Sequence, residues 1–486
     1  MVPAVLSRVS ANVGSGSFLV AQNSLKFGTS GLRGLAVELE GQAARRYTSA
    51  FLQHLVNIGQ SGAGQVYLGR DFRASSPTIL TDCAVAIARS GLEPVDCGAI
   101  PTPALALHAM AAGCPAIMVT GSHIPADRNG LKFYAPRGEI SKADEAGILG
   151  ALRATDIADA APVLVDESHE ATERYFARCA AIVAAGALTG LRIGVFEHSS
   201  VARDLLGRVL RHAGAEVVSL GRSDAFVAVD TEAFSDAVLA PLKDWVRDKK
   251  LDLLVSADGD GDRPLMMDAR SAFVRGDVLG LLTAQYLGAQ TVVTPVTSNS
   301  AIERTGYFKK VIRTRVGSPF VVAAMEQAPD GVVGFEANGG TFVGAAISVE
   351  GQPLKALPTR DAVLPLLCTT ALAVLRGVTV DQLVAELPLQ IAMADRLQDV
   401  AASKSADFLT RLVEEDGFAA GVFEPHGIAS VSVTDGVQFH TASGDMVHFR
   451  ASGNAPELRC YVEGRTSEIA RSLLDWAMGV AAENVR

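Results

Sequence analysis

The sequence lacks the paired cysteines of a disulfide framework or a structural zinc site. Its six cysteines are scattered, and no two of them are spaced as Cys-x-x-Cys: Cys83, Cys97, Cys114, Cys179, Cys368 and Cys460. Such spacing is typical of reduced thiols in a protein core. The first twenty residues, MVPAVLSRVSANVGSGSFLV, are too interrupted by Ser, Asn and Gly for a secretory signal. We therefore expect a cytoplasmic protein without disulfides or structural zinc.

Long apolar runs and an excess of basic residues are also missing. No stretch reaches the roughly 18 apolar residues that a membrane-spanning helix needs. Lys and Arg together number 43 against 53 for Asp and Glu, which gives a formal net charge of −10. Nucleic-acid-binding domains commonly carry basic patches instead. The composition therefore predicts neither a membrane nor a nucleic-acid partner.

The length and composition indicate several well-packed domains. The chain has 486 residues, and a single hydrophobic core stops growing at roughly 250 to 300 residues. Hydrophobic residues make up 49% and charged residues 20%, with 46 glycines. This is the composition of a folded, turn-rich protein, so extensive disorder is excluded.

Strand-like and helix-like segments alternate along most of the chain. Short apolar runs end in polar, glycine-rich turns at Asp71, His123, Ser200, Arg263, Asn299 and Gly340. This alternation predicts α/β domains with mixed, largely parallel sheets, whose ligands bind beyond the carboxyl ends of the strands. Residues 430–463 instead read as strands joined by turns, and an amphipathic helix follows from Ser467 to Val480. The C-terminal domain is therefore predicted to be α+β.

Three aspartates alternate with glycines in SADGDGDRP, at Asp258, Asp260 and Asp262. Two carboxylates about 6 Å apart repel by roughly 2 to 3 kcal/mol at an effective dielectric near 20, so a hard cation such as Mg²⁺ suits the cluster. A solvated acidic turn is the alternative. An EF-hand is excluded, because Arg263 stands where it needs Gly and Ala269 where it needs Glu. Arg263 would suit a phosphate that bridges it to the metal.

A second motif, VTGSHIPADRNGLKFY, exposes Ser122 and His123 on a turn after an apolar strand. Adjacent residues are not expected to bring imidazole and hydroxyl into contact, and no GxSxG elbow is present, so a hydrolase is disfavoured. Ser122 is either a reactive hydroxyl or an ordinary turn residue. Lys132 follows the Asn129-Gly130 turn and could return to the same site as a cation or proton carrier.

Two further turns carry residues suited to a sugar phosphate. In HFRASGNAPELRCYVEG, a turn between two strands holds Arg450, Ser452, Gly453 and Asn454, with Arg459 beyond it. Such a turn either cradles an anion or is a surface hairpin. In GFEANGG, the side chains of the acidic and amide residues, Glu336 and Asn338, either bind sugar hydroxyls or cap a helix.

Taken in order, FGTSGLRG, TGSHIPADRNGLKFY, DGDGDRP, GFEANGG and RASGNAPELR resemble the signature loops of the α-D-phosphohexomutase superfamily. The resemblance runs nearly from end to end. It implies three similar α/β domains and a different fourth domain around one central cleft. The expected domains are residues 1–165 with the phosphoserine loop, 166–268 with the metal loop, 269–391 with the sugar-recognition loop and 392–486 with the phosphate-binding loop.

The resemblance also implies a mechanism and roles for the residues. Ser122 would be phosphorylated, and one oxygen of the phosphoserine would bind Mg²⁺ together with the three aspartates. The hexose phosphate would take this phosphate, pass through a hexose 1,6-bisphosphate that also serves as activator, and return its other phosphate after turning round.

Roles for the remaining residues follow from the same resemblance. Arg33, Lys132 and Arg263 match cationic positions around the phosphoserine. Lys132 is the favoured proton carrier, with His123 as the alternative and Arg33 in support. The distant phosphate would be gripped by Arg450, Ser452, Gly453, Asn454 and Arg459, and ring hydroxyls would bind Glu336 and Asn338.

Departures from the common motifs bear on the substrate. The sugar loop ends in Asn338-Gly339-Gly340, where many members have Ser-Gly-His. The combination is similar to a bacterial branch of phosphomannomutases, so mannose is the first choice and glucose the second. A phosphoglucosamine mutase, a phosphatase and a non-catalytic sugar-phosphate-binding relative are the alternatives. The protein is expected to be a monomer or homodimer.

Overall fold

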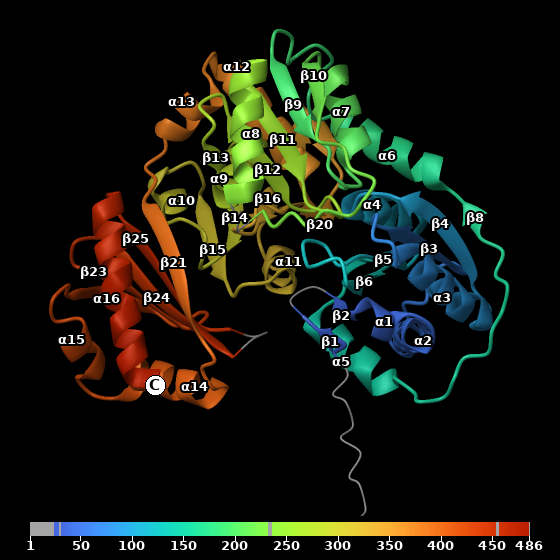
Figure 1. The fold of residues 1–486 in the computed structure, drawn as a ribbon, viewed down its shortest axis with the longest axis horizontal. Coiled ribbons are helices and arrows are strands. Elements are labelled where there is room, and N and C mark those ends of the chain that lie inside the picture. Colours follow the sequence, from blue (N-terminus) through green and yellow to red (C-terminus); the bar gives the residue numbers. More distant parts are fainter. Residues whose placement is uncertain (1–23, 29–30, 232–235, 453–455, 486) are drawn as a thin grey trace, which may run out of the picture.

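The computed structural model describes residues 24–28, 31–231, 236–452 and 456–485. The N-terminal stretch and two predicted phosphate-loop residues, Gly453 and Asn454, lie outside this part of the chain. Four sheets follow one another along an arc, from blue at the right through green and yellow to red at the left (Figure 1). The α/β fold with a distinct C-terminal domain that the sequence predicts is confirmed.

The first sheet has the order β1-β2-β6-β5-β3-β4-β8, with β7 paired to β6. Its strands are β1 Lys26–Phe27, β2 Leu32–Leu35, β3 Gln65–Arg70, β4 Glu93–Ala99, β5 Ala116–Val119, β6 Arg128–Ala135, β7 Gly138–Glu139 and β8 Val165–Asp166. One face packs against α2 Gln42–Asn57, α3 Ser76–Arg89 and α5 Lys142–Ala151, and the other against α4 Thr102–Ala112 and α6 Ser168–Ala180. A short helix, α1 Ala36–Leu39, follows β2. Every residue of β5 is buried, as in a strand covered on both faces.

The second sheet has the order β10-β9-β11-β12-β13. It consists of β9 Arg192–Phe196, β10 Glu216–Leu220, β11 Leu253–Ala257, β12 Pro264–Asp268 and β13 Phe273–Val274. One face packs against α8 Asp236–Lys249, and the other against α7 Arg203–His212.

The third sheet has the order β15-β14-β16-β17-β20, from β14 Thr291–Pro295, β15 Lys310–Thr314, β16 Val332–Phe335, β17 Thr341–Val343 and β20 Leu357–Asp361. Its two faces pack against α11 Ser318–Glu326 and against α9 Gly276–Tyr286 with α12 Val363–Arg376. The hairpin of β18 Ile347–Val349 and β19 Gln352–Leu354, and the short helices α10 Ala301–Arg304 and α13 Val380–Ala385, complete this region.

The fourth sheet is antiparallel throughout, in the order β21-β25-β24-β23-β22. Its strands are β21 Ile391–Gln398, β22 Ile428–Ser432, β23 Val437–Thr441, β24 Met446–Ala451 and β25 Glu457–Gly464. The helices α14 Ala402–Glu414, α15 Phe418–Val422 and α16 Ser467–Val485 accompany it, and one face packs on α14 and α16. The predicted C-terminal helix is thus confirmed and continues past Val480.

The first three sheets repeat one strand order, which positions the functional loops. In each of them three parallel strands, ordered second-first-third, are followed by a fourth antiparallel strand: β4-β3-β5-β6, β10-β9-β11-β12 and β15-β14-β16-β17. The loop between the third and fourth strands carries Ser122 in the first sheet, the aspartates in the second and Glu336 in the third. The three predicted site loops therefore occupy equivalent places in three repeats.

The cysteines and the helices bear on two further predictions. All six cysteines are buried and free, as predicted. In the part of the chain that the structure describes, none of the helices combines the length and apolar character that crossing a bilayer requires. The predicted domain boundaries stay predictions.

Candidate active site

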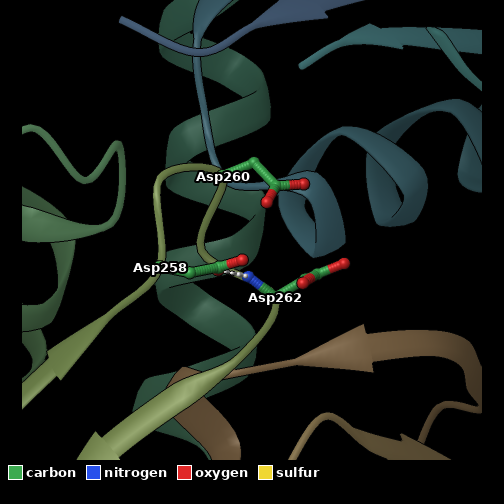
Figure 2. Close-up of side chains that lie close together, drawn as sticks. All are labelled: Asp258, Asp260 and Asp262. Carbon is green, nitrogen blue, oxygen red and sulfur yellow. Dashed lines mark hydrogen bonds between the residues drawn. The ribbon is translucent and has the colours of Figure 1, made fainter. Parts of the chain in front are cut away.

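The metal-loop aspartates lie together on the hairpin between β11 and β12. Asp258, Asp260 and Asp262 are each 0% exposed, and one oxygen from each lies within 4.8 Å of the others. Figure 2 shows the turn holding all three carboxylates, with the backbone N–H of Asp262 donating to Asp258. The solvated acidic turn is therefore excluded, because these groups are buried.

Glycines allow this hairpin to press against the phosphoserine loop. A Cβ on Gly259 would lie 3.0 Å from the carbonyl oxygen of Ser122, and Gly261 has a φ of 71°. The second glycine thus adopts a left-handed conformation that is costly for other residues. The alternating glycines of the motif are explained by this close approach and by the tight turn.

Asp260 and Asp262 each accept hydrogen bonds at the outer oxygen, Oδ2, while the inner oxygen, Oδ1, has no hydrogen-bond partner in the described part of the chain. Lys132 Nζ donates to Asp260 Oδ2 at 2.5 Å and to Asp262 Oδ2 at 2.6 Å, and Thr102 Oγ1 donates to Asp260 Oδ2 at 2.7 Å. Oδ1 of Asp260 and Oδ1 of Asp262 are buried without a hydrogen-bond partner among the described residues. Buried anionic oxygens without donors are costly, and a bound cation satisfies them. The residues therefore fit a metal site.

The carboxylates differ in their preference for the charged form. Burial, with the neighbouring Asp260 and Asp262, raises the pKa of Asp258 to about 8. Burial also acts to raise the pKa of Asp262, but Arg360, Lys132 and Arg263 outweigh it and hold that pKa well below its usual range. A cation bound between the carboxylates would favour the ionised form of Asp258.

Ser122 points into this cluster from the loop after β5. Its Oγ donates to Asp258 Oδ2 at 2.7 Å, and the residue is 1% exposed. The backbone N–H of Ser122 donates to Thr120 Oγ1 at 2.8 Å. Ser122 also has a φ of 55°, a strained conformation of the kind found at functional sites.

The expectation that Ser122 and His123 cannot touch is wrong. Ser122 Oγ lies 3.2 Å from His123 Nδ1, because the left-handed backbone at Ser122 replaces the extended geometry in which adjacent side chains diverge. Burial, with Arg263 and Arg33 nearby, lowers the pKa of His123 to about 2. The imidazole beside the hydroxyl is therefore neutral near pH 7.

A buried arginine that sequence reasoning missed holds the phosphoserine loop. Arg73 donates to the carbonyl oxygens of Ser122 at 2.9 Å, Ile124 at 2.7 Å and Pro125 at 2.6 Å. A Cβ on Gly121 would lie 2.6 Å from its Cζ, so the glycine before Ser122 makes room for the guanidinium. The sequence signal for Arg73 is the segment GRDFR at the end of β3. Sequence reasoning recognised only that an apolar run ends at Asp71.

Cations gather around the aspartates. Arg33 on β2 pairs in register with Gly130 on β6, the strand of Lys132. Burial, together with Arg263 and Arg360, lowers the pKa of Arg33 to about 10. Arg263 Nε lies 3.9 Å from Asp262 Oδ1. The predicted cations Arg33, Lys132 and Arg263 are thus brought together, and the concentration of positive charge suits a phosphate.

The sugar loop lies against the metal hairpin. A Cβ on Gly339 would lie 2.6 Å from Pro264 Cγ, at the start of β12. Glu336 and Asn338 are 5% and 7% exposed, and Asn338 Oδ1 accepts from the backbone N–H of Gly340 at 3.0 Å. Arg360, which was not predicted, joins Glu336 to Asp262. The structure therefore connects Glu336 to the same buried cluster as Ser122.

Among the described residues, those predicted to bind the distant phosphate lie on or next to β24 and β25 of the fourth sheet. Arg450 and Arg459 are cross-strand partners on β24 and β25, and the backbone N–H of Ser452 donates to the Glu457 carbonyl at 2.9 Å. Within the described residues, no hydrogen bond or ion pair given by the structure joins Arg450 or Arg459 to Ser122 or the aspartates. Arg450 Nε instead donates to Asp435 Oδ2 at 2.7 Å.

A third arginine continues this row on the sheet. Arg396 on β21 is the cross-strand partner of Arg459, so Arg396, Arg459 and Arg450 stand at one register on one face of three strands. Sequence reasoning missed Arg396, because no local motif marks it. We call Arg396, Arg450 and Arg459 the arginine row.

Comparison with known proteins assigns the family. The phosphoglucomutase/phosphomannomutase α/β/α domains I, II and III match residues 24–158, 173–271 and 275–390, and the C-terminal domain of that family matches residues 389–477. A phosphomannomutase of Sinorhizobium fredii is 45% identical over 471 residues, covering 94% of this chain and 98% of that protein. The chain belongs to the phosphoglucomutase/phosphomannomutase family of α-D-phosphohexomutases. It is a phosphohexomutase of the phosphomannomutase type.

Other relatives agree with this assignment. A phosphomannomutase of Salmonella muenchen is 40% identical over 467 residues, covering 94% of this chain and 95% of that protein. The crystal structure of a phosphoglucomutase/phosphomannomutase family protein from Burkholderia thailandensis has a TM-score of 0.74 at 20% identity and covers 94% of this chain and 98% of that one. The second comparison shows the shared fold, and the first shows the shared family.

Proposed function

We propose that this phosphohexomutase interconverts mannose 1-phosphate and mannose 6-phosphate through a phosphorylated Ser122. The observation that carries the proposal is the 2.7 Å hydrogen bond from Ser122 Oγ to Asp258, inside a buried trio of aspartates. A serine hydroxyl that lies among three carboxylates is badly placed to be the nucleophile of a hydrolase. It is well placed to carry a phosphate whose charge a cation and nearby arginines neutralise.

The proposed metal is Mg²⁺, held by Asp258, Asp260, Asp262 and one oxygen of phospho-Ser122. The three aspartates offer only oxygen ligands, and Oδ1 of Asp260 and Oδ1 of Asp262 have no hydrogen-bond partner among the described residues. Both features favour a hard cation such as Mg²⁺. When bound, Mg²⁺ supplies neutralisation of charge on the transferring phosphoryl group. Lys132 donates to Oδ2 of Asp260 and Oδ2 of Asp262, which would leave the two Oδ1 atoms for the cation.

Two phosphoryl transfers make up the proposed reaction. In the first, the bond between Ser122 Oγ and phosphorus breaks and a bond from phosphorus to the free C6 oxygen of mannose 1-phosphate forms. The proton of that hydroxyl passes to Ser122 Oγ. The product is mannose 1,6-bisphosphate. After it turns round, the bond between phosphorus and the C1 oxygen breaks, a bond from phosphorus to Ser122 Oγ forms again, and the serine proton passes to the C1 oxygen. Arg33 and Arg263 would stabilise the charge on the moving phosphoryl oxygens.

Lys132 and His123 are the two candidates for carrying the proton of the accepting sugar hydroxyl. The sequence favoured Lys132, but the hydrogen bonds that its ammonium makes in the structure go to Asp260 and Asp262. His123 is neutral near pH 7 and lies 3.2 Å from Ser122 Oγ. The 3.2 Å contact supports His123 as the group that passes the proton between Ser122 Oγ and the sugar hydroxyl, because the negative charge of a phosphate on Ser122 would raise the pKa of the imidazole. Lys132 stays the alternative proton carrier.

The substrate must bind in two orientations with the same residues. Glu336 and Asn338 are proposed to hold ring hydroxyls in either orientation. The distant phosphate is assigned to Arg450, Ser452, Gly453, Asn454 and Arg459. Two proteins named phosphomannomutase, at 45% and 40% identity over nearly the full length, support mannose as the first choice. Glucose is the second choice, and the cytoplasmic location and the monomeric or homodimeric state remain predictions.

A coupled assay tests the proposal. The purified protein is supplied with Mg²⁺ and catalytic glucose 1,6-bisphosphate, and kcat/KM is measured for mannose 1-phosphate, glucose 1-phosphate and glucosamine 1-phosphate. We expect the highest kcat/KM with mannose 1-phosphate and little free phosphate. A preference for glucosamine 1-phosphate would show that the protein is a phosphoglucosamine mutase. Release of free phosphate would indicate a phosphatase. If the phosphorylated protein turns over none of the sugars, a non-catalytic sugar-phosphate-binding protein is favoured.

A further inference from the structure

Arg360 connects the sugar loop to the metal loop from the edge of the third sheet. It lies on β20, next to β17, and is 3% exposed. Its Nε and Nη2 each lie 2.9 Å from Asp262 Oδ2, and its Nη1 donates to Glu336 Oε2 at 3.0 Å. One guanidinium thus joins two carboxylates from two different domains. Its planar fork of donors suits this arrangement, which a lysine could not reproduce.

Glu336 depends on this contact. The carboxylate is buried, and the bond from Arg360 is the one side-chain hydrogen bond that the structure gives it among the described residues. A buried carboxylate without a cationic partner would lose its charge or turn away. Because Arg360 holds Oε2, the other oxygen, Oε1, is left to accept a hydrogen bond from a ligand.

The stem of Arg360 explains an unusual glycine of the sugar loop. A Cβ on Gly340 would lie 2.5 Å from Arg360 Cδ and 2.6 Å from Cγ. No side chain fits at position 340 while Arg360 keeps this conformation. A histidine here, as in Glu-x-Ser-Gly-His, would therefore require Arg360 to move.

We propose that Arg360 is a positioning residue for sugar recognition, which fixes Glu336 so that its free oxygen meets a ring hydroxyl of the hexose phosphate. This inference rests on the proposed function. Arg360 acts through Glu336, to which its Nη1 donates while its Nε donates to Asp262. Sugar recognition is thereby tied to the orientation of Asp262 in the metal loop.

A double-mutant cycle tests the inference in the full chain. Ser122→Ala serves as the parent, so that mannose 1-phosphate binds without turnover, and its affinity is measured by calorimetry in Mg²⁺. We expect Arg360→Gln and Glu336→Gln each to weaken binding at least tenfold, and the pair together to weaken it no more than the stronger single change. Such non-additivity is the signature of two residues that act as one unit.

Arg178→Gln is the matched control. Arg178 is also a buried arginine next to this strand, where its Nη1 donates to the carbonyl of Lys355 at 2.6 Å, but it contacts neither Glu336 nor Asp262. Its loss should lower the melting temperature and leave the affinity for mannose 1-phosphate within threefold. Inorganic phosphate, which has no ring hydroxyls, should bind the Arg360→Gln protein within threefold of the parent.

The outcomes separate this inference from the proposed function. Losses that multiply in the double variant, or unchanged binding by a folded Arg360→Gln protein, would overturn the role of Arg360. A parent that binds no hexose phosphate, with a wild type that turns none over, would overturn the proposed function instead. If Arg360→Gln does not fold, the cycle is run with Arg360→Lys, which keeps the charge but not the fork, and the same non-additivity is required.

Discussion

The chemical centre and the arginine row are built in opposite ways. Around Ser122, a continuous buried network runs through Asp258, Asp262 and Arg360 to Glu336, and it draws on three domains. The arginine row stands on the sheet of the fourth domain, and its only described ion pairs are with acidic residues of that domain.

This difference matches the two tasks of a mutase. The reacting groups must keep one geometry, which burial and shared hydrogen bonds enforce. The arginine row is proposed to hold either phosphate of a substrate that binds in two orientations, and a separate domain would suit that task. The third and fourth domains share polar contacts, such as the 3.0 Å hydrogen bond from the Val316 N–H to Asp435 Oδ2. We expect the fourth domain to close over the substrate.

The largest expected effect comes from removing the phosphate carrier. Ser122→Ala should lower kcat by at least ~1000-fold, because it removes the hydroxyl that is proposed to carry the phosphate. The melting temperature should change little, since the side chain is small. The exposed Ser430→Ala is the control and should keep full activity. A Ser122→Ala protein with wild-type turnover would contradict the proposal that Ser122 carries the phosphate.

Loss of one metal-loop carboxylate should come next. Asp260→Asn replaces a charged, partnerless oxygen with a neutral amide, so binding of Mn²⁺ as a probe for Mg²⁺ should weaken by ~100-fold or more, equivalent to ~3 kcal/mol. Electron paramagnetic resonance of free Mn²⁺ measures the change. Asp248→Asn, on the surface of α8, should bind the ion like the wild type. Equal affinities of all three proteins would contradict the metal site.

Changes in the arginine row should affect substrate binding and spare the chemistry. Arg450→Ala should raise KM by ~10- to 100-fold, as expected for a charge-assisted hydrogen bond, while transfer of phosphate from a saturating bisphosphate to Ser122 slows much less. Steady-state and single-turnover kinetics separate the two. If both rates fall together, Arg450 belongs to the chemical centre and the contrast between the regions fails.

Arg396 should contribute a smaller share. Its side chain is 52% exposed and lies 3.5 Å from Glu457 Oε1, so Arg396→Ala should raise KM by only ~2- to 5-fold, and less at high salt. The comparison of KM at low and high ionic strength checks this. A loss as large as that of Arg450→Ala would make Arg396 a principal phosphate ligand.

The smallest expected effect concerns pH and the strand that carries Arg450. Burial lowers the pKa of His448 from an ordinary 6.5 to about 4. As the pH falls below 6.5, the unfolded chain binds a proton that the folded one does not, so stability is lost between those values. From pH 7.5 to 5 the loss is roughly 2 kcal/mol. Melting should therefore shift less with pH in His448→Gln than in wild type; identical shifts would contradict the buried neutral imidazole.

Local motifs made part of the site predictable. The aspartates and Ser122 stand at strand ends in glycine-rich turns, where residue types and spacing indicate their chemistry directly. The α/β repeats were predictable for the same reason, since alternating strand and helix patterns depend on neighbouring residues.

Long-range contacts made the rest unpredictable. Arg360 reaches Asp262 across 98 positions of sequence, and Arg73 reaches Ser122 across 49. Nothing local to these arginines marks such partners. The contact of Ser122 with His123 escaped prediction for another reason, because it depends on a left-handed backbone that non-glycine residues rarely adopt.

The most direct test of the account follows the phosphate itself. Protein labelled on its phosphate is digested and its labelled peptide sequenced, and a second portion is mixed with excess mannose 1-phosphate in Mg²⁺ for less than one turnover. We predict label on Ser122 and its transfer into mannose 1,6-bisphosphate and mannose 6-phosphate. Label on another residue, or its release as inorganic phosphate, would contradict it.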